Sequence, residues 1–185
     1  MFTKEQGKKL LSLARQSIES NFSGNVIDFS EYKKEFPAQQ GVFVTITIKG
    51  ELRGCIGFPE PVYPLYKAVN LAAQAAAFED PRFPSLKKDD FPKIKIEISV
   101  LTVPQLIEVK KAEDYIKRIK IGEDGLIIRG ELGSGLLLPQ VFTDYNCDAK
   151  KAMEMICQKA GLKSDEWKDL SNKIYKFQAQ IFEEE

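Results

Sequence analysis

Residues 42–58 constrain the fold most, because they predict two antiparallel strands joined by a tight turn. Branched apolar residues alternate with other side chains from 42 to 48, and a second alternation runs from 52 to 58. A period of two that is rich in such residues is typical of strands that bury one face. Gly50 lies between the runs and can take the left-handed conformation that a three-residue hairpin loop needs at its last position. The segment therefore predicts a β-hairpin with one apolar and one polar face.

The loop length sets the register of this hairpin. A three-residue loop places Val44 opposite Gly54 and Phe43 opposite Cys55. A two-residue loop would shift the register by one residue and mix the apolar face of one strand with the polar face of the other. On the three-residue register, Cys55 shares a face with Arg53 and with two threonines.

The rest of the chain predicts helices and strands in alternation. Residues 4–20 form an amphipathic pattern that begins with a capping box at Thr3, and residues 65–78 form an alanine-rich helix. The small alanines allow close approach of another backbone, for which Gly54 is the expected partner. The other expected elements are a strand over 94–100, a short helix over 112–117, strands over 126–129 and 136–138, a helix over 149–160, a turn near Trp167 and a strand over 175–181.

This order of elements predicts an α+β fold with a largely antiparallel sheet flanked by helices. Lysine plus arginine equals aspartate plus glutamate, so net charge favours neither nucleic acid nor an anionic membrane. No apolar run has the length of a membrane span, and the first twenty residues lack the apolar centre of a signal peptide. Three cysteines without a CxxC pattern fit a reducing cytoplasm.

The absence of histidine restricts the chemistry further. It excludes Ser-His-Asp and Cys-His arrangements within the chain and every zinc site that needs histidine. Three dispersed cysteines make a poor metal cage, so no metal or other cofactor is expected. Any acid–base chemistry must use Asp, Glu, Lys, Tyr or Cys.

The hexapeptide Leu52-Arg53-Gly54-Cys55-Ile56-Gly57 resembles the hallmark motif of the AMMECR-type domain, LRGCIG. Three further matches follow in the family's order and extend the resemblance over nearly the whole chain. They are Asp80-Pro81-Arg82-Phe83, then Gly135 to Val141, and then Lys159 to Leu162 with Trp167.

This resemblance implies one domain over residues 1–185, in two unequal lobes with the hexapeptide facing the gap between them. We expect the larger lobe to comprise residues 1–103 and 140–185, and the smaller lobe residues 104–139. Archaeal and bacterial members resemble partners of a Memo-type protein and a radical SAM enzyme. The biochemical activity of the family is not established, so the resemblance leaves it open whether the chain is an enzyme.

The candidate site residues lie in the matched motifs. Cys55 is the candidate catalytic residue, as a nucleophile or redox thiol, although buried structural cysteines are common. Arg53 suits a carboxylate or phosphate group of a ligand, but it is equally compatible with a structural ion pair, for which Asp80 is the expected partner. The full set of expected ligand-binding residues is Arg53, Gly54, Gly57, Asp80, Arg82 and Gln140.

Three functions remain open from the sequence. The first is a small-molecule enzyme or ligand-binding protein with its site around Arg53 and Cys55. The second is a non-enzymatic interaction module that works with the Memo-type and radical SAM partners. Nucleic-acid binding is the third and least favoured, because the chain has no net positive charge and no arginine–aromatic platform.

Overall fold

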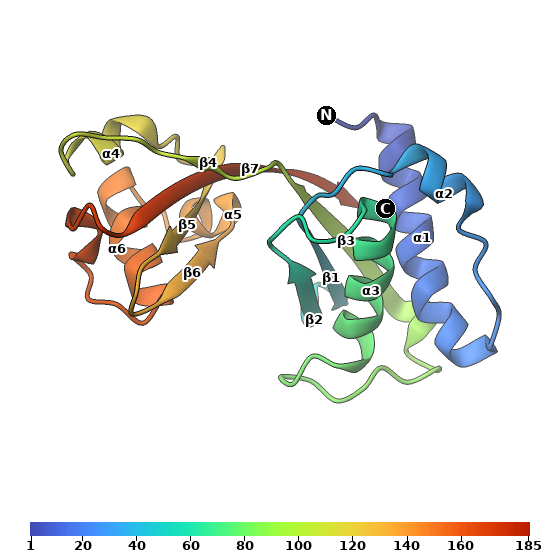
Figure 1. Ribbon diagram of the computed structural model, residues 1–185. Coiled ribbons are helices and arrows are strands. Elements are labelled where there is room, and N and C mark those ends of the chain that lie inside the picture. The colour runs from blue at the N-terminus through green and yellow to red at the C-terminus, as the bar shows by residue number, and fades with distance from the viewer. The chain divides into compact units, whose positions relative to one another are not determined.

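The computed structural model describes residues 1–185 and shows a mixed α/β fold with six α-helices (Figure 1). The pairs β1–β2, β1–β3, β4–β7, β5–β6 and β5–β7 are antiparallel, which confirms the predicted α+β class with its largely antiparallel sheet. The chain divides into two compact units. The first comprises Met1–Leu101 and Gln180–Glu185, and the second comprises Thr102–Ala179.

In the first unit, strand β1 pairs with β2 on one side and with β3 on the other. Helices α1 and α3 cover one face of these strands and pack against each other (Figure 1). The buried side chains of the strands, among them Val44, Ile46 and Ile98, meet the apolar stripes of the two helices. The elements of this unit are α1 (Lys4–Ser23), α2 (Ser30–Glu35), β1 (Val42–Ile48), β2 (Glu51–Phe58), α3 (Leu65–Phe78), a 3₁₀ turn (Phe91–Lys93) and β3 (Ile94–Leu101).

The helix ends in this unit follow their local sequence signals. Thr3 Oγ1 accepts the backbone N–H of Gln6 at 3.2 Å, and the Gln6 side chain accepts the Thr3 N–H at 3.0 Å. This reciprocal pair confirms the predicted capping box. Helix α3 ends at Phe78, because Asp80 precedes Pro81 and is disfavoured in the helical region.

The predicted hairpin exists, but its predicted register is wrong. Thr45 lies opposite Cys55, whereas Val44 lies opposite Ile56 and Ile46 lies opposite Gly54. A two-residue turn, not a three-residue loop, joins β1 and β2.

The central residues of this turn are Lys49 and Gly50, both with positive φ, at 53° and 81°. Positive φ at both central positions is typical of the two-residue turns whose twist matches paired strands. The expected positive φ of Gly50 is therefore confirmed, although the loop is shorter than predicted.

A β-bulge explains how a two-residue turn keeps the two faces of the hairpin separate. Gly54 pairs with Ile46 and Leu52 pairs with Thr47, so Arg53 is the extra residue on β2. The bulge shifts the alternation by one residue, as bulges do, and keeps the buried faces together beyond it. It also places Leu52 on the same face as Thr47, where Leu52 is 44% exposed instead of joining the apolar face.

Residues 180–185 complete the first unit. The carboxylate of Glu184 receives two hydrogen bonds from the Arg15 guanidinium, both at 2.6 Å, and one from the Ile96 N–H at 2.9 Å. The Gln180 carboxamide accepts the backbone N–H of Phe2 at 2.8 Å and donates to the carbonyl oxygen of Phe2 at 2.7 Å. These contacts fix the end of β7 to α1, to β3 and to the segment before α1.

The second unit has its own sheet and core. Strand β7 lies between β4 and β5, and β6 pairs with the other edge of β5. Helix α6 packs on β5 and β6 and buries Met153, Ile156 and Cys157. The elements are β4 (Gln105–Leu106), α4 (Asp114–Arg118), β5 (Asp124–Arg129), β6 (Ser134–Leu137), α5 (Pro139–Asp144), α6 (Ala149–Lys159), a 3₁₀ turn (Glu166–Lys168) and β7 (Lys173–Glu183), whose last residues belong to the first unit.

The second unit extends further than the smaller lobe expected from the sequence. The expected boundary after residue 103 lies near Leu101, but the expected return to the larger lobe at residue 140 is wrong. Helices α5 and α6 pack on β5 within the second unit, and only residues 180–185 return to the first. Helix α5 was not predicted, because Pro139 and Gln140 resemble the end of a strand more than the start of a helix. None of the helices has the length and apolar character needed to cross a membrane.

Candidate functional site

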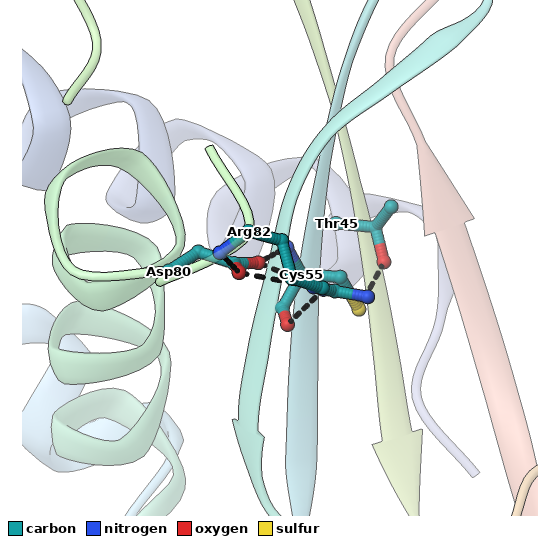
Figure 2. A network of polar contacts seen from close by, with 4 residues as sticks. All are labelled: Thr45, Cys55, Asp80 and Arg82. Carbon is teal, nitrogen blue, oxygen red and sulfur yellow. Dashed lines mark hydrogen bonds and ion pairs between the residues drawn. The ribbon is translucent and has the colours of Figure 1, made fainter. Parts of the chain in front are cut away.

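Cys55 lies on β2 with its side chain on the face opposite the helices of the first unit. Its Sγ atom is 3.1 Å from Oγ1 of Thr45, which occupies the facing position on β1 (Figure 2). Cys55 is partly exposed, whereas Cys147 and Cys157 are buried in the second unit. Burial raises the pKa of the Cys157 thiol to about 11, consistent with the structural role expected for that residue. Cys55 is thus the one cysteine of the three that is available to a ligand.

The backbone of Cys55 is held from both ends by the loop that follows α3. Its N–H donates to Asp80 Oδ2 at 2.9 Å, and its carbonyl oxygen accepts Arg82 Nη2 at 3.1 Å (Figure 2). Strand β2 is an edge strand, so these two backbone groups have no neighbouring strand to bind. The side chains of Asp80 and Arg82 therefore satisfy an exposed strand edge as a further strand would.

Asp80 is almost fully buried and binds Arg82 through both carboxylate oxygens. Oδ1 accepts Arg82 Nε at 3.0 Å and the Arg82 backbone N–H at 3.1 Å, while Oδ2 accepts Arg82 Nη2 at 2.8 Å. The hydrogen bonds from the Arg82 side chain, with those from the Cys55 and Arg82 backbones, hold the pKa of Asp80 far below its usual value. The same carboxylate raises the pKa of Arg82, and the Cys55 thiol adds to this effect. Asp80 is consequently an anchor for Arg82 and too weak a base to accept a proton from Cys55.

The partner expected for Asp80 was Arg53, and this expectation is wrong. Arg53 is the bulged residue of β2, and its Nη2 donates to the carbonyl oxygen of Pro84. Its Cζ lies 6.0 Å from the centre of the Phe83 ring, and Arg82 Cζ lies 5.5 Å from the same ring. The cation fixed beside Cys55 is therefore Arg82. The sequence indicated this pair, because Asp80 and Arg82 flank Pro81 in a tight loop. The predicted hairpin register favoured Arg53 instead, because it placed Arg53 on the face of Cys55.

Close packing explains why glycine occupies positions 54 and 57 of the hexapeptide. A Cβ atom at Gly54 would collide with the carbonyl oxygen of Ala76 on α3, which confirms the expected close approach of the alanine-rich helix. A Cβ atom at Gly57 would meet the carbonyl oxygen of Val42 and the ring of Phe43. Both glycines therefore let the strand lie close to its neighbours.

Gln140 belongs to helix α5 of the second unit and lies outside the group formed by Cys55, Asp80 and Arg82. Its Oε1 atom is buried without a hydrogen-bond partner. An unpaired buried acceptor is costly, so this atom is a site where a donor would bind favourably.

Thr45 was expected on the same face as Cys55, but opposite Arg53 and not opposite the thiol. Glu97 was not expected at the site: it faces Thr45 from β3, on the same side of the sheet. Burial raises the pKa of Glu97, and the nearby Glu183 raises it further. The alternation of residues 94–100 had placed Glu97 on a polar face, but only the pairing with β1 shows which residues it faces.

The arrangement suits a thiol that reacts without a histidine base. The hydroxyl group of Thr45 lies 3.1 Å from the Cys55 sulfur, and the guanidinium of Arg82 binds the carbonyl oxygen of the same residue. A hydroxyl group and a fixed positive charge therefore lie next to the thiol, where the chain has no histidine to act as a base. No group of three or more histidine, cysteine, aspartate or glutamate side chains is arranged to hold a metal ion.

The fold and this site define a mixed α/β protein in which an Asp–x–Arg loop clamps an edge strand that carries a cysteine. The AMMECR1 family model matches residues 11–182, so the chain belongs to the AMMECR1 family. The resemblance seen in the sequence is thereby confirmed.

Archaeal relatives extend over almost the same length. A protein of Methanothermobacter thermautotrophicus is 44% identical over 185 residues, which cover 99% of this chain and 96% of the relative. Protein MJ0810 of Methanocaldococcus jannaschii is also 44% identical, with 100% and 92% covered. The crystal structure of the uncharacterized protein PH0010 from Pyrococcus horikoshii is similar, with a TM-score of 0.90 and 43% identity over 100% of this chain and 94% of that one. The fold is thus shared with a solved relative.

Proposed function

We propose that this protein binds a small molecule at Cys55, and that the thiol of Cys55 reacts with or contacts that molecule. The observation that carries the proposal is the Arg82 guanidinium, which Asp80 fixes beside a partly exposed cysteine. If Arg82 served only to bind the free backbone groups at the edge of β2, residue 55 could be any residue and would not need to be a cysteine. The Thr45 hydroxyl adds a polar group at 3.1 Å from the sulfur.

The ligand is proposed to carry an anionic group. The Nη1 atom of Arg82 has no hydrogen-bond partner in the protein, and the Arg82 side chain is 54% exposed. Arg53 contributes a second guanidinium at the same Phe83 ring. Two guanidinium groups with free N–H donors suit a carboxylate or phosphate.

Alkylation of Cys55 by iodoacetamide tests this proposal, with peptide mass spectrometry to separate the three cysteines. We expect Cys55 to react faster than the buried cysteines. When a cell extract of small molecules is separated into fractions, one fraction should protect Cys55 from alkylation. Arg82→Gln should slow the reaction at neutral pH, while Arg82→Lys should retain much of the rate and Arg53→Gln should have a smaller effect. Equal rates in wild type and Arg82→Gln, with no protection by any fraction, would refute the proposal.

The remaining candidate residues have separate roles in this proposal. Gly54 and Gly57 are proposed to contribute only their backbone to the site at Cys55. Gln140 is proposed as a ligand contact within the second unit, because its buried Oε1 lacks a partner.

A second candidate function is an interaction module for the Memo-type and radical SAM partners that the family resemblance implies. The observation that favours it is Leu52, which the bulge turns to the surface beside Arg53, together with Val62, which is 55% exposed. Co-purification from cells that express both proteins separates the two functions. If the interaction predominates, Leu52→Glu abolishes co-purification with the Memo-type protein, while Cys55→Ala has no effect on it.

A further inference from the structure

A polar cavity lies within the second unit, apart from the residues around Cys55. Its volume is about 220 Å³, smaller than most sites for drug-sized ligands and suited to a single ring or a short amide. Its lining consists of Thr102, Gln105, Asp124, Lys176, Phe177 and Gln178.

The cavity interrupts what is otherwise the apolar face of a sheet. On β7 and β5, Ile174 faces Ile128, and both side chains are fully buried in the core of the second unit. Because side chains alternate with a period of two, Lys176 and Gln178 lie on this same face of β7. Gln178 faces Asp124 on β5, and Asp124 is only 2% exposed. Lys176 and Gln178 are partly exposed and Gln105 is exposed, so the cavity opens to solvent over the buried carboxylate of Asp124.

The two charged residues of the cavity neutralise each other. Lys176 Nζ donates to Asp124 Oδ2 at 3.1 Å and to the carbonyl oxygen of Arg118 at 3.0 Å. The same Oδ2 atom accepts the backbone N–H of Lys120 at 3.0 Å. The cavity therefore presents no net charge to a ligand, which argues against an anion or a cation.

Several hydrogen-bonding groups at the cavity are unused. Both bonds to Asp124 end on Oδ2, so Oδ1 keeps its acceptor capacity. The ammonium of Lys176 has three protons and uses two of them. The carboxamides of Gln105 and Gln178 make no hydrogen bond within the protein and are accessible to solvent, and therefore to a ligand. A free donor and a free acceptor thus lie on one ion pair, with two carboxamides beside them.

We propose that this cavity binds a small neutral molecule with an amide-type edge, in which a carbonyl oxygen adjoins an N–H group. The carbonyl oxygen accepts the third proton of Lys176, and the N–H donates to Asp124 Oδ1. Gln105 and Gln178 each offer a donor and an acceptor to the rest of the molecule. The proposal does not depend on the function proposed for Cys55.

Uracil and 1,3-dimethyluracil form a matched pair of probes, because methylation removes both N–H groups and keeps the ring. Each is titrated into the ¹⁵N-labelled full-length protein, and backbone amide shifts are followed. We expect uracil to shift the amides of residues 102–106, 124 and 176–178 in a saturable way. 1,3-Dimethyluracil should not change the chemical shifts of these amides at the same concentrations. Acetamide and N,N-dimethylacetamide repeat the comparison without a ring.

Substitutions in the cavity then locate the site. Gln105→Leu and Gln178→Leu remove carboxamides that hold no other part of the protein, and each should raise the Kd of uracil about three- to tenfold. Gln158→Leu, on the exposed side of α6, is the control and should not change it. The absence of localised shifts with both uracil and acetamide would overturn the proposal. So would equal shifts with the methylated probes, or a Kd that neither cavity substitution changes.

Discussion

Asp80 illustrates how one buried carboxylate can serve two segments at once. It accepts the Cys55 N–H of β2 and fixes the Arg82 guanidinium, which in turn binds the Cys55 carbonyl oxygen. Replacing Asp80 by Asn leaves fewer acceptors for these donors in a buried position. We expect Asp80→Asn to lower the free energy of unfolding by about 2 kcal/mol at pH 7. Asp89→Asn is the control, because Asp89 is exposed in the loop that follows.

The pH dependence of this loss follows from the lowered pKa of Asp80. A carboxylate whose pKa is lower in the folded protein stabilises it above the unfolded pKa of about 3.9. This stabilisation is lost as the pH falls from there toward the folded value. The difference in unfolding free energy between wild type and Asp80→Asn should therefore be constant from pH 7 to about 5 and shrink below pH 4. A difference that stays constant down to pH 2.5 would contradict the assignment.

At the level of residues, the sequence identified the right motifs and paired them incorrectly. The thiol, the two arginines and the buried aspartate were all expected at a site from their motifs. The choice between Arg53 and Arg82 as the partner of Asp80 depended on the hairpin register and on the direction of a bulged side chain. Neither follows from residue types, because Leu52, Gly54 and Ile56 alternate in the sequence as if they shared one face, although the bulge at Arg53 turns Leu52 to the other face.

Among the elements, the hairpin turn offers a direct test of the corrected register. Lys49 has positive φ, a conformation that Asn and Gly adopt more readily than Lys. Lys49→Asn should raise the free energy of unfolding by about 0.5 kcal/mol, and Gly50→Ala should lower it by about 1 kcal/mol. Denaturant unfolding measures both. If Lys49→Asn destabilises the protein, the turn has a different backbone conformation.

The contact between β2 and α3 gives a second prediction at this level. Gly54→Ala should lower the free energy of unfolding by about 1–3 kcal/mol, because its Cβ would overlap with the Ala76 carbonyl oxygen. Ala76→Gly should not restore stability in the double variant, since the obstacle is a backbone atom. Full recovery in the double variant would mean that the Ala76 side chain is the contact instead.

Long elements were predicted more successfully than short ones. Helix α3 was expected at its observed residues, and the capping box and the strand β3 were also correct. These elements have several turns of helical periodicity or a full alternating pattern. The two-residue strand β4 and the six-residue helix α5 carry too few residues for either period to be visible. The boundary of the second unit was misplaced for the same reason, since α5 lies where the return to the first unit was expected.

For the molecule as a whole, the first unit depends on a segment that follows the second in sequence. Glu184 holds Arg15 and the backbone of β3, so Glu184→Gln should weaken the first unit. Native-state hydrogen exchange should show lower protection in α1 and β3, by about 2 kcal/mol, with α6 and β5 unchanged. Glu183→Gln, on the exposed face of β7, is the control. Equal loss of protection in both units would show that they unfold as one.

The discontinuity of the first unit also has a consequence for biosynthesis. The ribosome makes residues 1–101 first, but their sheet lacks its last segment until residues 180–185 have emerged. Residues 102–179 form one unbroken stretch and can fold as soon as they leave the exit tunnel. The part of the chain that is made first is therefore completed last, and its unfinished sheet is exposed to chaperones while the rest is translated.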